Sequence, residues 1–88
     1  MPDLSGKIAF VSGASRGLGL QFSRALAKAG ADLIVTSRTL DSLDGTVAEI
    51  EALGRKCFPV ELDVREESSI HAAVDAAIAE FGKIDILI

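Results

Sequence analysis

The chain has 88 residues, 49% of them hydrophobic, which suits one domain or part of one and is enough to build an apolar core. Its formal net charge of −4 at pH 7 argues against nucleic-acid and anionic-membrane partners, because both attract basic surfaces. One cysteine and one histidine exclude a disulfide framework within the chain and a zinc site built from these two residue types.

The chain opens with a predicted strand at 7–11 and a predicted helix at 18–29, joined by a glycine-rich turn. The turn contains Gly13, Gly17 and Gly19. A strand, a glycine-rich turn and a helix together present free backbone N–H groups to a phosphate. The three glycines would permit a tight turn, let the backbone approach a pyrophosphate, and let helix and strand pack closely. The pattern predicts a dinucleotide site, and a purely structural loop is the alternative.

The second predicted strand, 32–36, is followed by Ser37 and Arg38. An acidic residue at this place would accept hydrogen bonds from the ribose hydroxyls of NAD and repel the 2′-phosphate of NADP. The chain has a serine there instead, and Arg38 and Arg16 supply two positive charges that can grip a phosphate. We therefore predict NADP(H) as the cofactor, with a solvated surface charge as the alternative reading of each arginine.

The third predicted strand, 57–61, follows a predicted helix at 40–53 and precedes Asp63 and Val64. Asp63 can accept a hydrogen bond from the adenine amino group while Val64 packs on the ring. The alternative is that Asp63 caps the next predicted helix, 66–81. Ser15, in the glycine-rich turn, can bond a phosphate oxygen or only stabilise the turn.

A fourth predicted strand, 84–88, completes an alternation of strands and helices. The strands are dense in apolar residues, as are parallel strands covered on both faces. With right-handed crossovers, this pattern predicts an α/β fold with a doubly wound parallel sheet in the order 3-2-1-4.

These residues resemble the classical short-chain dehydrogenase/reductase family over the whole chain. The resemblance rests on segment 12–19 as the cofactor turn, on Arg38, on Asp63 with Val64, and on 82–88 as the entry into the fourth strand. It implies a Rossmann-like fold, with residues 1–88 as the N-terminal part of one NADP-binding domain. The candidate cofactor-binding residues are Gly13, Ser15, Arg16, Gly17, Leu18, Gly19, Ser37, Arg38, Asp63 and Val64.

The resemblance also implies an oxidoreductase that acts on a carbonyl/alcohol pair. Family members use a serine and a Tyr-x-x-x-Lys pair after the fourth strand, and this chain ends at Ile88 and contains no tyrosine. We therefore assign no catalytic residue and expect the 88 residues to be inactive by themselves. A non-catalytic NADP(H)-binding module and an inactive truncated fragment are the alternatives.

Several expectations concern the surroundings of the protein. The family resemblance implies a small carbonyl or alcohol substrate for a longer parent protein, and a homo-oligomer. Residues 1–7 carry no secretory signal, and no apolar run reaches the roughly 20 residues that span a bilayer. We therefore expect no membrane partner and a cytoplasmic location.

Overall fold

The computed structural model describes residues 3–88 and contains four strands, three α-helices and one short 3₁₀ helix. In chain order the elements are β1 (Ile8–Val11), α1 (Gly17–Lys28), β2 (Asp32–Ser37), η1 (Leu40–Leu43), α2 (Asp44–Ala52), β3 (Cys57–Glu61), α3 (Glu67–Phe81) and β4 (Ile86–Leu87). All paired strands are parallel, and the sheet order is β3-β2-β1-β4. The predicted α/β fold and its strand order are confirmed.

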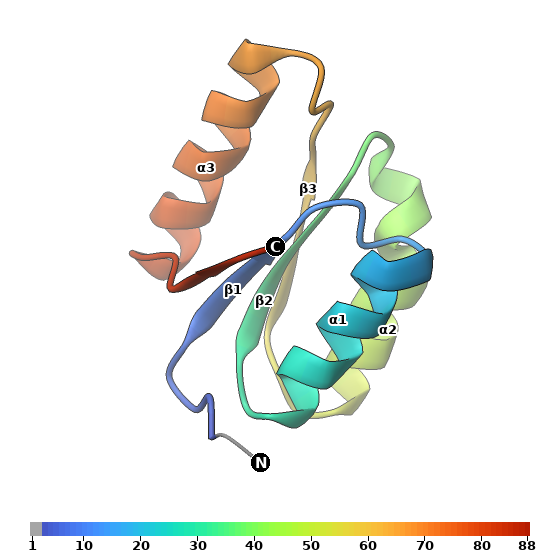
Figure 1. Cartoon of the computed structure of the whole chain (residues 1–88), viewed down its shortest axis with the longest axis vertical. Helices are drawn as coiled ribbons and strands as arrows, with labels where there is room; N and C mark the ends of the chain where they lie inside the picture. Colours follow the sequence, from blue (N-terminus) through green and yellow to red (C-terminus); the bar gives the residue numbers. More distant parts are fainter. Residues whose placement is uncertain (1–2) are drawn as a thin grey trace.

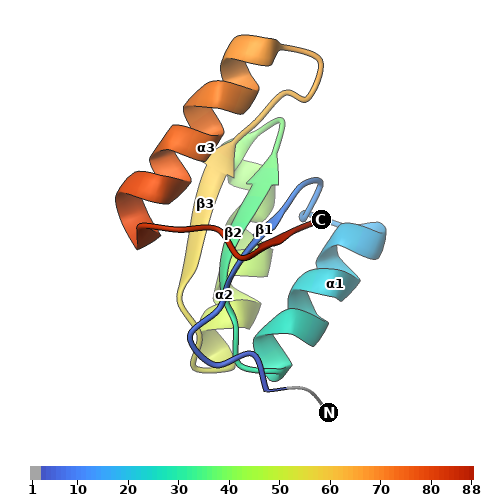
Figure 2. The same ribbon diagram turned by 60° about the vertical axis from the view of Figure 1, so that its left-hand side comes forward.

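The helices cover the sheet on both faces, with α1 and α2 on one side and α3 on the other (Figures 1 and 2). Each strand therefore contributes alternate side chains to two separate cores. Val11 and Leu33 belong to the core under α1 and α2, whereas Phe10 and Ile34 belong to the core under α3. Burial on both faces explains why the strands are continuously apolar in sequence.

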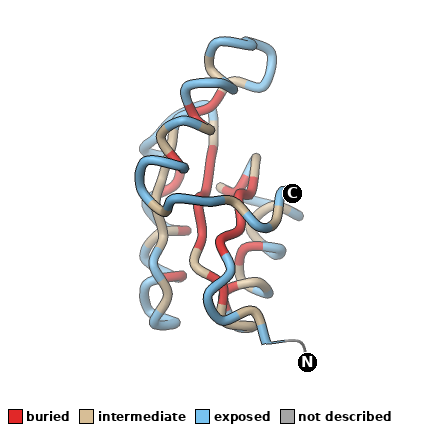
Figure 3. The backbone as a smooth tube through the Cα atoms, turned by 90° about the vertical axis from the view of Figure 1, so that its left-hand side faces the viewer, coloured by how far each residue is buried: buried red, intermediate tan, exposed pale blue. Residues whose placement is uncertain are grey.

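The helices meet the sheet through small side chains. Ser23 and Ala27 are the buried residues of α1, and Ala73 and Ala77 are those of α3. Small residues let a helix backbone lie close to a sheet. The larger apolar side chains that show the helical pattern in sequence are not the ones buried against the sheet. Leu18, for example, is 68% exposed. Figure 3 shows this division, with buried positions along the inner strands and exposed positions along the outer helix surfaces.

Most elements lie within one residue of their predicted bounds, and two differ by more. The predicted helix 40–53 divides into η1 and α2, so Gly45 lies in the first turn of α2 and not in mid-helix. The predicted strand 84–88 is paired only at Ile86 and Leu87. Just before β4, Asp85 is held to β1 twice: its backbone N–H donates to the carbonyl oxygen of Ile8 at 2.8 Å, and its carboxylate accepts a hydrogen bond of 2.9 Å from the backbone N–H of Ile8.

A glycine directly follows the last residue of α3 and ends that helix. Gly82 caps α3 at a φ of 81°, in the left-handed region that glycine adopts without strain. Within residues 3–88, no helix is long and apolar enough to cross a membrane.

Candidate functional site

An open pocket of about 920 Å³ lies at the carboxyl edge of the sheet. Its walls come from the turn after β1, the end of β2 and the residues after β3, which meet at one edge because the strands are parallel (Figure 2). This edge is where open α/β sheets bind their ligands. The pocket brings together these predicted site residues: Gly13, Ser15, Arg16, Ser37, Arg38, Asp63 and Val64.

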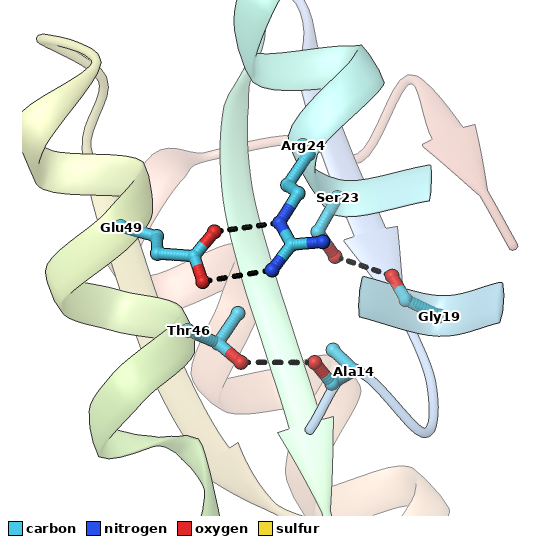
Figure 4. A network of polar contacts seen from close by, with 6 residues as sticks. All are labelled: Ala14, Gly19, Ser23, Arg24, Thr46 and Glu49. Atoms are coloured by element: carbon cyan, nitrogen blue, oxygen red, sulfur yellow. Dashed lines mark hydrogen bonds and ion pairs between the residues drawn. The ribbon is translucent and has the colours of Figure 1, made fainter. Parts of the chain in front are cut away.

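The glycine-rich turn is fixed at Ala14, which is fully buried. The backbone N–H of Ala14 donates to the carbonyl oxygen of Thr36 at 2.9 Å. The carbonyl oxygen of Ala14 accepts a hydrogen bond of 3.0 Å from Thr46 Oγ1 of α2 (Figure 4). Both polar groups of the Ala14 backbone are thus paired, and the turn is tied to β2 and to α2.

Glycine is required at three places in the turn. Gly13 has a φ of 61° and Gly17 a φ of 63°, both in the left-handed region. A Cβ at Gly19 would collide with the carbonyl oxygen of Gly13 and would lie 2.7 Å from its carbonyl carbon. Gly19 is therefore the position that lets α1 pack directly on the turn, as the spacing predicts.

The N-terminus of α1 is open toward an anion. Arg16 occupies the N-cap position, and its side chain makes no capping hydrogen bond to any residue of 3–88. The first helical residues, Gly17 to Gly19, have N–H groups that the helix itself cannot pair. Together with the helix dipole, these groups favour a phosphate. Three predicted site residues, Gly17, Leu18 and Gly19, are not among the residues that line the pocket.

Two arginines from different segments line the same pocket. Arg16 comes from the turn after β1 and Arg38 from the segment after β2, and both are exposed where they line the cavity. Ser37 lines the same pocket, at the position where an acidic residue would mark an NAD site. These two segments therefore bring two positive charges and a neutral serine to the pocket, whose lining also includes the carboxylates of Glu61 and Asp63.

Asp63 does not cap α3, so this alternative is wrong. The N-cap residue of α3 is Glu66, and within residues 3–88 no side chain makes a capping hydrogen bond at that end of the helix. The Asp63 carboxylate instead accepts hydrogen bonds from the side chain of Arg65 and, at 3.0 Å, from the Arg65 backbone N–H. These hydrogen bonds, foremost those of the side chain, lower the pKa of Asp63 to about 2.

Asp63 therefore remains a charged acceptor at the pocket wall across the neutral range. Its two oxygens receive three hydrogen bonds from Arg65, which leaves capacity for a further donor because a carboxylate has about four lone-pair sites. An exocyclic amino group is such a donor.

The pocket also contains lining residues that the sequence reasoning missed, namely Thr36, Thr39, Ser42, Glu61 and Leu62. Three of them, Thr36, Thr39 and Leu62, adjoin predicted site residues in the chain, and Glu61 is the last residue of β3, so the strand ends themselves could have indicated these four. Ser42 is different, because it reaches the pocket from η1 through a hydrogen bond to Ser37 with 2.7 Å between the two Oγ atoms. No sequence motif signals that contact.

The turn and the pocket match known proteins in sequence and in structure. The chain matches the family described as short chain dehydrogenase over residues 7–88. It is 37% identical over 89 residues to a peroxisomal 2,4-dienoyl-CoA reductase of Danio rerio, covering 99% of this chain and 30% of that protein.

Two solved structures are similar over almost the whole chain. One is a short-chain type dehydrogenase/reductase from Mycobacterium marinum, with a TM-score of 0.94 and 39% identity over 97% of this chain and 34% of that one. The other is a metagenomic short-chain oxidoreductase in complex with NADP, with a TM-score of 0.89 and 34% identity over 94% of this chain and 38% of that one.

The chain therefore spans about a third of the length of these relatives. Its similarity to them covers the glycine-rich turn, the sheet and the pocket edge. On this evidence, the chain belongs to the short-chain dehydrogenase family and corresponds to the N-terminal portion of its members.

Proposed function

We propose that these residues form the NADP(H)-binding part of an oxidoreductase that interconverts a carbonyl compound and an alcohol. The observation that carries the proposal is that Arg16, Arg38 and the uncharged Ser37 line the same pocket. Two guanidinium groups favour a 2′-phosphate, and no carboxylate stands at position 37 to repel it. The NADP in the related metagenomic oxidoreductase agrees with this choice.

The residues of the site fit a dinucleotide in order along the sheet edge. The open N-terminus of α1 and the hydroxyl of Ser15 suit the pyrophosphate. Arg16 and Arg38 suit the phosphate on the adenosine ribose. Asp63, a carboxylate with remaining acceptor capacity, suits the adenine amino group, and the exposed Val64 suits the face of the ring.

The bound cofactor would supply the hydride, while the residues of this chain bind and orient it. The family's mechanism, as the resemblance implies it, uses a tyrosine, and the 88 residues contain none. We therefore propose that this stretch binds the cofactor without turning it over. A small carbonyl or alcohol substrate, assembly into a homo-oligomer and a cytoplasmic location remain predictions, and one relative is peroxisomal by name.

A non-catalytic NADP(H)-binding module is the second candidate. The lack of a tyrosine in these 88 residues favours the binding module only if no further segment of the protein carries catalytic residues. Carbonyl reduction by the natural protein, followed as oxidation of NADPH at 340 nm, separates the two candidates. Binding of NADPH without turnover of any carbonyl compound supports the module.

The cofactor itself is tested by titration with 2′,5′-ADP and 5′-AMP in a calorimeter. These fragments differ only in the 2′-phosphate, so their affinity ratio measures recognition of that group alone. We expect 2′,5′-ADP to bind at least about tenfold more tightly, as one charge-assisted contact provides. Equal affinities would contradict NADP, and the absence of binding of either fragment would contradict a dinucleotide site.

A further inference from the structure

The hydroxyl groups of Ser37 and Ser42 form a chain with a fixed direction. Ser42 Oγ lies 2.7 Å from Ser37 Oγ and 2.7 Å from the carbonyl oxygen of Thr39. Both distances are near the optimum for O–H···O hydrogen bonds. A carbonyl oxygen only accepts, so the single proton of Ser42 points at Thr39. The proton between the two serines must then come from Ser37.

This direction determines what Ser37 can offer to a ligand. Its only proton is engaged with Ser42, and its free lone pairs remain. Ser37 therefore faces the pocket as an acceptor, like the carboxylate that would occupy this place in an NAD site, but without the negative charge. A ribose hydroxyl can donate to it, whereas a phosphate oxygen can receive a hydrogen bond from it only when the Ser37 proton turns away from Ser42.

We propose that Ser42 is a specificity-determining residue of the cofactor site, which holds Ser37 as an acceptor and so favours a ribose hydroxyl over a 2′-phosphate. This inference rests on the proposed function and deepens it. Arg16 and Arg38 attract the 2′-phosphate, and the Ser42–Ser37 pair opposes them. These opposing effects limit the preference for NADP, so that NAD can also bind to the same site.

The test replaces Ser42 by alanine and compares the affinities for 2′,5′-ADP and 5′-AMP. Without Ser42 Oγ, the proton of Ser37 is free to turn toward the phosphate. We expect the affinity ratio to shift toward 2′,5′-ADP by about fivefold, the size of one modest hydrogen bond. The ratio cancels any general loosening of η1, which affects both nucleotides alike.

Two matched variants isolate the cause. Ser42→Thr keeps the hydroxyl and should leave the ratio unchanged. In a Ser37→Ala background, Ser42→Ala should have no effect on the ratio, because no serine proton remains to be released. Where Ser42→Ala does not fold, Ser42→Cys keeps the volume with a much weaker hydrogen-bonding group and should shift the ratio in the same direction.

An unchanged ratio in Ser42→Ala would overturn the inference while leaving the NADP(H) site in place. An equal shift in the Ser37→Ala background would also overturn it, since the effect would then not pass through Ser37. Failure of the unaltered protein to bind either nucleotide would overturn both the inference and the proposed function.

Discussion

The guanidinium group of Arg65 binds both carboxylate oxygens of Asp63, with Nε 3.0 Å from Oδ1 and Nη2 2.9 Å from Oδ2. The two residues are separated by Val64 alone, and both Asp63 and Val64 line the pocket. The Asp63 carboxylate, which we propose binds the adenine amino group, is thereby oriented by its own near neighbour in sequence. The Arg65 side chain of this ion pair is exposed, so the pair contributes little to the folding stability. Its contribution to the site is to orient the Asp63 carboxylate and to keep it charged.

We predict that Arg65→Ala raises the pKa of Asp63 from about 2 toward its ordinary value of 3.8. The rise should be incomplete, because the backbone N–H at position 65 still donates to Oδ1 at 3.0 Å. Since folding lowers the pKa of this acid, its stabilising effect is present above about pH 4 and is lost as the pH falls toward 2.

The carboxyl carbon resonance of Asp63, followed by NMR as the pH is lowered, gives this pKa directly. Arg65→Lys is the matched control, because it keeps the charge and loses the planar pair of donors. Its pKa should fall between those of the other two proteins. A midpoint near 3.8 in the unaltered chain would contradict the hydrogen-bonded geometry.

We predict that Thr46→Val destabilises the protein by about 1–3 kcal/mol, because it leaves the buried carbonyl oxygen of Ala14 without its hydrogen bond. The change is nearly isosteric, so little packing is lost. It should also weaken 2′,5′-ADP binding, since Ala14 lies in the turn that faces the phosphates. Thr46→Ser keeps the hydroxyl and should bind the nucleotide normally. Urea unfolding and calorimetry measure the two effects, and equal binding by both variants would show that the bond does not matter to the turn.

We predict that Gly19→Ala abolishes nucleotide binding, because its Cβ would collide with the Gly13 carbonyl and force the turn away from α1. Gly45→Ala is the control, since a Cβ there meets no atom of residues 3–88 within 4 Å. That change should stabilise α2 by less than the ~1 kcal/mol that separates the two residues in a helix interior, because position 45 lies in the first turn. Thermal unfolding and 2′,5′-ADP titration distinguish the two. Normal binding by Gly19→Ala would disprove the close approach.

Much of the fold could be predicted from sequence because the strands are buried on both faces. Residues such as Phe10 and Val11 are apolar neighbours that serve opposite cores, so the strand appears as an uninterrupted apolar run. The order of the strands followed from the handedness of the crossovers. The helix faces were harder to predict, because Ser23 and Ala27 contact the sheet while the more hydrophobic Leu18 and Phe22 are exposed.

The candidate site also has a part that could be predicted from the sequence and a part that could not. Its predicted residues follow strand ends, and the carboxyl ends of parallel strands must meet, so Arg16 and Arg38 could be placed together without a structure. The parts played by Ser42 and Thr46 could not. Each depends on a hydrogen bond to a residue elsewhere in the chain, and the second crosses 32 positions. Such contacts leave no periodic pattern.

We predict that the 88-residue chain self-associates through β4. Within residues 3–88, β4 pairs with β1 alone, and Leu87 beside that free edge is 73% exposed. An exposed apolar edge strand is a template for pairing with another copy. Sedimentation velocity at rising concentrations should show growing species, and Leu87→Lys should suppress them. A stable monomer of the unaltered chain at every concentration would count against this.

We predict that Arg38→Asp reverses the preference for the 2′-phosphate. The new carboxylate would repel that phosphate and accept hydrogen bonds from the ribose hydroxyls, so 2′,5′-ADP should bind at least about tenfold more weakly while 5′-AMP binds as well or better. Arg16→Ala should reduce 2′,5′-ADP affinity less, because it removes one charge and adds none. Arg55→Ala is the control: Arg55 lies at the opposite edge of the sheet, where its Nη1 donates to the carbonyl oxygen of Gly30, and its loss should leave the ratio unchanged. A preference for 2′,5′-ADP that survives in the protein with both Arg16→Ala and Arg38→Asp would mean that other groups read the phosphate.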